Sequence, residues 1–238
     1  MIDAFVKAFA QLPDKRIRGV VIVSLLGALA IYLALAGALW WALTDTVLVS
    51  LPWVEALLDV LGGVAVFVLS LLFFPAVVTM IIGFFLEQVA DAVEARHYPG
   101  LPPNREQPVW EIIGSTAKFA AVAIGLNILA LPLYLLLLFI PGSSLVLFYA
   151  LNGYLLSREY FEAVALRRAD AATVKSLRRQ HTGRLWLVGA AITFLATVPF
   201  VNMLAPVVGT AAMTHVATGL MRRHKLLDKP VPTAEPAQ

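Results

Sequence analysis

The sequence contains no cysteine and little charge, and several long stretches have no charged residue at all. Without cysteine, disulfides, thiolate metal sites and cysteine nucleophiles are excluded. Only 14% of the 238 residues are charged and 60% are hydrophobic. In average soluble domains about 25% of residues are charged and about 45–50% are hydrophobic. The uncharged stretches are residues 19–44, 60–86, 119–157 and 185–221. Each is longer than the roughly 20 residues needed to cross a bilayer, which predicts an integral membrane protein.

The first two stretches predict one transmembrane helix each, over 19–43 and 60–86. The first is too long for the apolar region of a cleavable signal peptide, which has about 7–15 residues. It carries alanine at every fourth position, a smooth face that favours close helix packing: Ala30, Ala34, Ala38 and Ala42. In the second helix Pro75 lacks an amide hydrogen, which predicts a bend.

Turn-forming residues interrupt the third and fourth stretches, at 141–144 and 199–206. The pattern predicts two helical hairpins, over 119–156 and 185–221. An apolar arm such as 145–156 is about 18 Å long as a helix, which is too short for a hydrocarbon core of about 30 Å. We therefore expect both hairpins to be re-entrant, entering the bilayer without crossing it and keeping their tips in protein or beside water.

The first twelve residues place their apolar side chains on one helical face, which predicts a short amphipathic helix in the membrane interface. Residues 1–228 are then expected to form a single all-α integral membrane domain with two long transmembrane helices, two re-entrant hairpins and this N-terminal amphipathic helix. We expect residues 229–238 to be a flexible tail.

Lysine and arginine occur in every connecting segment except residues 44–59. The positive-inside rule therefore places that loop outside the cytoplasm and both termini in the cytoplasm. If the four hairpin arms were full spans, the charge distribution would give the same sidedness. The length of the arms is therefore what favours re-entrant hairpins over further spans.

Chemically reactive groups are scarce in the apolar stretches, where His215 is the one side chain that titrates near neutral pH. The sequence has no HExxH or P-loop motif, and Ser70, Ser143 and Ser144 have no evident base. We therefore expect no catalytic residue, no metal site and no cofactor, and we assign His215 a packing role. The net charge of +3 favours anionic lipid or a small anion as the partner over nucleic acid.

A basic turn precedes the first span and reads DKRIR over residues 14–18. Lys15, Arg16 and Arg18 lie there beside a helix N-terminus, where free amides, the helix dipole and guanidinium groups together favour a tetrahedral dianion. These charges can equally anchor the helix at the phospholipid headgroups. A second basic segment, 175–184, is expected to face headgroups.

Three segments resemble one known family: 152–162 (NGYLLSREYFE), Arg167 with Arg168, and 199–207 (PFVNMLAPV). They are similar to the CysZ-type bacterial sulfate-uptake proteins and their etoposide-induced-protein relatives, and the likeness runs in order over nearly the whole chain. The resemblance implies two transmembrane helices, two hemi-penetrating hairpins, an inner-membrane location, symmetric oligomers and a part in sulfate entry for cysteine synthesis.

In that family a Gly-Leu-Arg-Arg-like turn before the first span is associated with bound sulfate, and the resemblance gives this role to Arg16 and Arg18. The present chain departs from the pattern, because it lacks the glycine and the adjacent arginines and has Asp14 beside the turn.

The leading hypothesis is an inner-membrane protein for uptake of sulfate or a related oxyanion, a channel or facilitator and not an enzyme. Because one chain offers few polar groups to line a path, we expect a homo-oligomer with Asn127, Asn152 and Asn202 near the pathway. The alternative is a non-transporting membrane scaffold or lipid-organising protein, whose hairpins load one leaflet. Replacing Arg16 and Arg18 separates the two, since only the transport hypothesis predicts lost anion binding.

Overall fold

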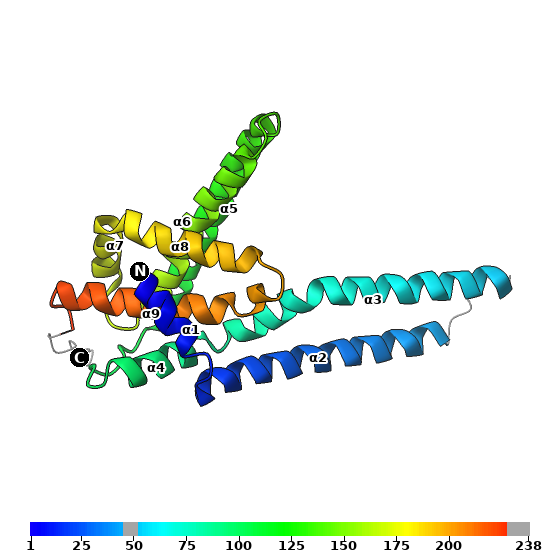
Figure 1. Ribbon diagram of the computed structural model, residues 1–238, viewed down its shortest axis with the longest axis horizontal. Coiled ribbons are helices and arrows are strands. Elements are labelled where there is room, and N and C mark those ends of the chain that lie inside the picture. Colours follow the sequence, from blue (N-terminus) through cyan, green and yellow to red (C-terminus); the bar gives the residue numbers. More distant parts are fainter. Residues whose placement is uncertain (45–51, 228–238) are drawn as a thin grey trace.

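The computed structural model describes residues 1–44 and 52–227, and the regular structure within these ranges is entirely helical (Figure 1). The helices in chain order are α1 (Ile2–Ala10), α2 (Lys15–Thr44), α3 (Pro52–Gly83), α4 (Leu86–His97), α5 (Val109–Leu137), α6 (Ser143–Ala165), α7 (Ala171–Gln180), α8 (Thr182–Thr197), the short 3-10 helix η1 (Val201–Met203) and α9 (Ala205–Arg223). The tail predicted for 229–238 lies outside the described residues.

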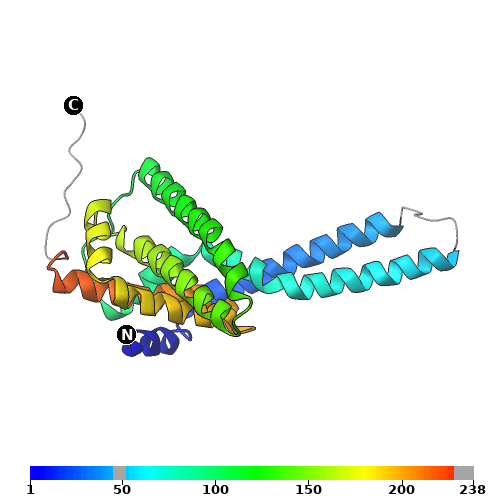
Figure 2. The ribbon, with the colours of Figure 1, turned by 90° about the horizontal axis from the view of Figure 1, so that it is seen from above.

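Helices α2 and α3 form a long pair that extends away from the rest of the molecule (Figures 1 and 2). The buried face of α2 carries Val20, Ser24 and Ala28. Further along the pair, the rings of Tyr32 and Phe74 lie 5.7 Å apart between centroids. These residues of α2 are four positions apart and lie on successive turns of the side that faces α3.

The predicted packing face of α2 is not the face that packs within this chain. Ala30, Ala34 and Ala38 are exposed, and the side chain of Ala42 lies outside the described residues. Alanine spacing alone does not say which helix meets this face, so close packing through it stays a prediction.

The bend in the second apolar segment lies beyond Pro75. Helix α3 runs through Pro75 and ends at Gly83. The axis then turns by 60° between Phe73–Gly83 and Leu86–His97. Helix α4 is therefore a separate element that begins where the apolar run ends.

Helices α5 and α6 form the first predicted hairpin, which leaves the body in a different direction from the pair of α2 and α3 (Figures 1 and 2). At its tip Gly142 has a φ of 80°, in the left-handed region that favours glycine. Ser143 then donates its hydroxyl to the carbonyl of Leu137 at 2.8 Å. With 23 residues, α6 is about 35 Å long and continues past the predicted apolar arm into a charged segment.

Helices α8 and α9 form the second predicted hairpin, and α9 lies at the centre of the fold. Every residue from Ala205 to Thr218 is buried, because α1, α4, α6 and α8 all contact this helix. Helix α1 covers α9 with Ala4 and Ala8 buried and leaves Ile2, at 83% of its surface, exposed. The predicted amphipathic helix is thus present, with its small residues turned toward protein and larger apolar ones outward.

Two described segments are long and apolar enough to cross a membrane, Lys15–Ala38 and Val109–Leu137. The bent pair of Phe73–Gly83 with Leu86–His97 makes a third if it counts as one span. The predicted class, an all-α membrane protein, is confirmed. How deeply the two hairpins enter the bilayer stays a prediction.

Candidate functional site

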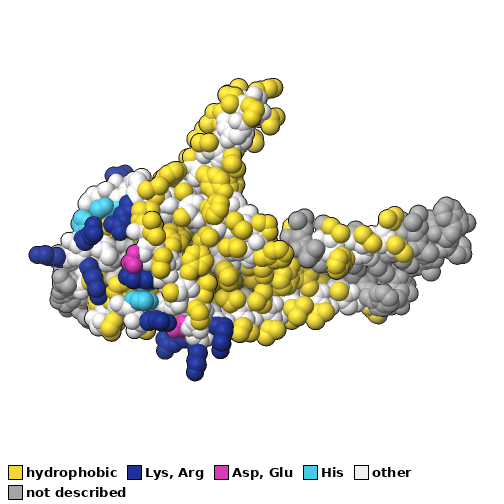
Figure 3. Space-filling view, viewed as in Figure 1, with side chains coloured by type: hydrophobic (Ala, Val, Ile, Leu, Met, Phe, Trp, Pro, Cys, Tyr) yellow, Lys and Arg dark blue, Asp and Glu magenta, His cyan; other side chains and the backbone are white. Residues whose placement is uncertain are grey.

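Charged side chains gather at one end of the molecule, around α1, α7 and the last turns of α9, whereas hydrophobic ones cover the projecting hairpin of α5 and α6 (Figure 3). The sequence produces this division because its charges lie between the apolar stretches and not within them. Any site for a charged ligand must therefore lie at this end or where the charged end meets the apolar arms.

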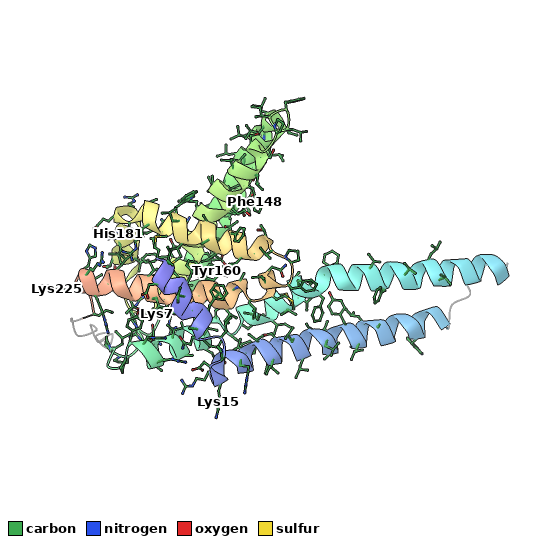
Figure 4. All side chains as sticks on the ribbon, viewed as in Figure 1. Lys7, Lys15, Phe148, Tyr160, His181 and Lys225 are labelled. Carbon is green, nitrogen blue, oxygen red and sulfur yellow. The ribbon has the colours of Figure 1, made fainter. Side chains whose placement is uncertain are left out.

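The basic turn forms the start of α2 at the charged end, where Lys15 projects from the body (Figure 4). Asp14 caps this helix, since its Oδ1 accepts the Arg16 amide at 2.9 Å and its carbonyl accepts the Arg18 amide at 2.8 Å. The second carboxylate oxygen of Asp14 lies 3.8 Å from Arg96 of α4. The turn is therefore joined to α4 by a residue that occupies one of the amides an anion could use.

The three predicted anion-binding residues, Lys15, Arg16 and Arg18, are exposed. Within the described part of the chain, none of their side chains forms an ion pair or a hydrogen bond. Arg96 adds a fourth exposed cation nearby. With one capping carboxylate among four cations, the corner keeps a net positive charge that can hold an anion through side chains more than through backbone amides.

The three asparagines predicted to lie near a pathway stand on different elements. Asn127 is exposed on α5 and donates to the carbonyl of Ala123 at 2.8 Å. Asn152 is half-buried on α6 and donates to the carbonyl of Phe148 at 2.9 Å. The Oδ1 of Asn202, in η1, is buried and accepts no hydrogen bond in the described structure. The fold of one chain does not bring the three together by any described hydrogen bond.

A buried ionic cluster ties the end of α6 to α4 and was missed by the sequence analysis. Glu94 is 6% exposed and accepts Arg168 at 2.6 Å. Arg167 pairs with Asp91 and lies 3.5 Å from Glu94, and its carbonyl accepts the amide of Arg105 at 2.8 Å. Adjacent arginines at 167–168 were the available signal, but their partners lie more than seventy residues away in sequence.

A second ionic group fixes the base of the hairpin. Glu162 accepts Arg158 at 3.0 Å and Arg178 of α7 at 3.4 Å. The guanidinium of Arg158 also lies 5.8 Å from the ring centroid of Phe119 on α5. Residues of α5, α6 and α7 all contribute, so this group joins three helices at the base of the hairpin.

His215 lies in a polar cluster between α4 and α9. Its Nδ1 is 2.8 Å from the hydroxyl of Tyr98, and its ring meets that of His97 edge-on at 4.8 Å. Arg222 covers the other side of Tyr98, 4.9 Å from the ring centroid. The geometry is that of a packed interhelical contact, in agreement with the role expected for His215.

The sequence matches the family described as "Sulfate transporter CysZ/Etoposide-induced protein 2.4" over residues 4–206. The chain belongs to this family. No curated protein matches it. The resemblance inferred from segments 152–162 and 199–207 is therefore confirmed, and the chain is a membrane protein of a transporter family.

The family match includes the basic turn, both ionic groups and the first hairpin. Most of α9 follows the matched range, since the match ends at residue 206 and α9 ends at Arg223. The matched range therefore covers the apolar arms and the charged corner of this chain, while the central helix extends beyond it.

Proposed function

We propose that this chain carries sulfate or a related oxyanion across the bacterial cytoplasmic membrane, as a channel or facilitator that supplies sulfate assimilation and cysteine synthesis. The observation that carries the proposal is the corner of exposed, unpaired cations at the start of the candidate span Lys15–Ala38, in a chain of this family. Arg16 and Arg18, with Lys15, are the groups that capture the anion.

Capture by this corner does not itself drive uptake. Moving a dianion into a negative interior costs about twice 2.3 kcal/mol per 100 mV of membrane potential. Passive entry therefore needs a concentration gradient or rapid consumption of sulfate inside the cell.

A homo-oligomer completes the pathway in this proposal. Asn127 stands exposed on the apolar helix α5, and among the described residues its carboxamide bonds only to the carbonyl of Ala123, an arrangement that hydrocarbon does not favour. The outward alanines of α2 at 30, 34 and 38 give a smooth face for a second helix. We place Asn127, Asn152 and Asn202 near the path that assembled protomers enclose.

Both termini lie in the cytoplasm in this proposal. Helix α1 and the end of α9 lie at the same end of the molecule, opposite the far tips of α2 and α3 (Figure 1). The basic side chains gather at that end (Figure 3), which supports a cytoplasmic position by the positive-inside rule.

Anion flux into proteoliposomes tests the function. Sulfate, sulfite, phosphate and chloride are compared for the native chain, for the double variant Arg16→Ala with Arg18→Ala, and for a control that replaces the exposed Lys175 and Arg179 of α7 by alanine. We expect sulfate flux in the native chain and the control, and a loss of at least tenfold in the double variant. Well-folded native protein with no sulfate flux above empty liposomes would refute transport.

The alternative function is a membrane scaffold that loads one leaflet and recruits partners through its basic segments. The observation that favours it is the hairpin of α5 and α6, which projects apart from the other arm and exposes Phe139 to 85% at its tip. If the chain is a scaffold, the native chain binds no anion. The Arg16 and Arg18 double variant then changes only the affinity for lipid.

A further inference from the structure

A cavity of about 360 Å³ lies where the hairpin of α5 and α6 meets α4 and α9. One part of its wall is apolar and includes Leu86, Ile112 and Phe119. Polar residues also line it and include Glu87, Glu159 and Thr210. The lining is thus mixed, which suits a ligand with a polar end and a hydrocarbon end.

The uncompensated charge of the wall is negative. Neither Glu87 nor Glu159 has an ion-pair partner among the described residues, whereas Glu162 is held by Arg158 and Arg178. Arg167, the one cation of the wall among the described lining residues, is already occupied by carboxylates of α4. An anion is therefore disfavoured here and a cationic group is favoured.

Thr210 supplies a second, independent sign of a missing ligand. It is 4% exposed, and its buried hydroxyl has no hydrogen-bond partner among the described residues. Two other buried threonines bond to the carbonyl four residues earlier, Thr193 to Gly189 and Thr214 to Thr210. A buried hydroxyl left unpaired is unfavourable, and a donor or acceptor in the cavity would offset that cost.

A compact metal ion does not fit this wall. In residues 1–44 and 52–227, no three histidine or acidic side chains lie close enough together to hold one. The wall instead offers separate oxygen acceptors beside apolar surface, which suits an organic ammonium with several N–H donors.

The start of α5 forms one border of the cavity. Ile112 both lines the cavity and is 46% exposed, and Trp110, two residues before it at the start of α5, is 74% exposed. Exposed tryptophan at a helix end favours the headgroup level of a bilayer. We therefore expect the start of α5, and the cavity beside it, to lie near the headgroups.

We propose that this cavity binds a phospholipid with a primary ammonium headgroup, whose ammonium meets Glu159 and Glu87 while its chain runs along Phe119 and Ile112. Desolvation raises the pKa of the Glu159 carboxyl, and a bound cation would favour the ionised form. The site is distinct from the anion-capturing corner at Arg16, so the two proposals fail or hold separately.

Native mass spectrometry of the full chain in detergent tests the site with three lipids of equal chain length, carrying ethanolamine, choline and glycerol headgroups. Choline keeps the positive charge but has no N–H donor, and the glycerol lipid is anionic. We expect the ethanolamine lipid to bind at least tenfold more tightly than the other two. Equal binding of all three, or preference for the anionic lipid, would overturn the proposal.

The variant Glu159→Gln with Glu87→Gln should reduce the ethanolamine preference to less than threefold, and Thr210→Val should weaken ethanolamine binding several-fold. Glu106→Gln, in the loop outside the cavity wall, is the matched control and should bind as the native chain does. An unchanged preference in the double variant would contradict the assignment of these carboxylates. If that variant does not fold, the three-lipid comparison on the native chain still decides the proposal.

Discussion

Replacing Gly189 by alanine is expected to destabilise the protein at the crossing of α6 and α8. A Cβ at this position would lie 2.0 Å from the carbonyl oxygen of Gly153 and 2.6 Å from the amide nitrogen of Ser157. Both blocking atoms belong to the backbone of α6, so no side chain can turn aside to make room.

The magnitude follows from that geometry. Carbon and oxygen in contact ordinarily stay about 3.3 Å apart, so the two helices would have to separate by roughly 1.3 Å. Overpacking of this kind costs about 1–3 kcal/mol, here toward the upper end, and alanine returns about 1 kcal/mol through its better helix propensity. The net loss of about 2 kcal/mol corresponds to a fall in Tm of roughly 4–8 °C for a chain of this size.

Thermal melting followed by size-exclusion chromatography in detergent measures this difference. Gly219→Ala is the matched control, because that helical glycine in α9 has no atom within 4 Å of an added Cβ, and it should leave Tm unchanged or raised. If Gly189→Ala shows no folded peak while Gly219→Ala does, the destabilisation is larger than expected and supports the same conclusion. A Tm for Gly189→Ala equal to that of the control would refute the close helix contact.

Asp14→Asn should keep the cap of α2, since both residues cap well, and should remove a negative charge beside the captured anion. With the Asp14 carboxylate and a dianion about 8 Å apart in water, removing the carboxylate charge is worth about 1 kcal/mol. Sulfate affinity measured by calorimetry should therefore rise about fivefold. An unchanged affinity would place the anion elsewhere. Arg168→Ala removes the closest partner of buried Glu94 and should cost about 3–5 kcal/mol of stability. Lys7→Ala breaks an exposed ion pair and should change Tm little. Equal effects of the two variants on Tm would contradict the burial of the cluster. Burial, followed by nearby positive charge, lowers the pKa of His181 below its ordinary value. The contribution of His181 to stability is therefore present above about pH 6.5 and is lost as pH falls through the folded pKa. NMR titration in micelles should show the lowered pKa, and a pKa at or above the ordinary value would contradict it.

The helices themselves could be predicted because their determinants are local. Apolar runs without charge gave α2 and α5, and the turn at Gly142 separated α5 from α6 as expected. Proline was the less reliable signal, since the bend expected at Pro75 lies beyond it and both Pro75 and Pro132 stand inside continuous helices. In an apolar helix the lost hydrogen bond at proline can be compensated by neighbouring groups, so proline need not end the element.

The contacts between helices could not be predicted in the same way. The pair of Glu94 and Arg168 spans 74 positions of sequence, and nothing local to either residue identifies the other. The cavity is also a product of tertiary structure, because its wall combines the start of α5 with residues of α4, α6 and α9. The cations of the basic turn are exposed between a short helix and a long apolar one, and their role in binding an anion stays a prediction.

The position of α9 has a consequence for the biogenesis of the protein. Among the described helices α9 leaves the ribosome last, yet it supplies the core against which α1, α4, α6 and α8 pack. Chains generally fold from the N-terminus as they are made, but here the apolar arms enter the bilayer before their common base can close. A nascent chain that stops before α9 therefore lacks the helix against which α1, α4, α6 and α8 pack, so those four helices have no common base.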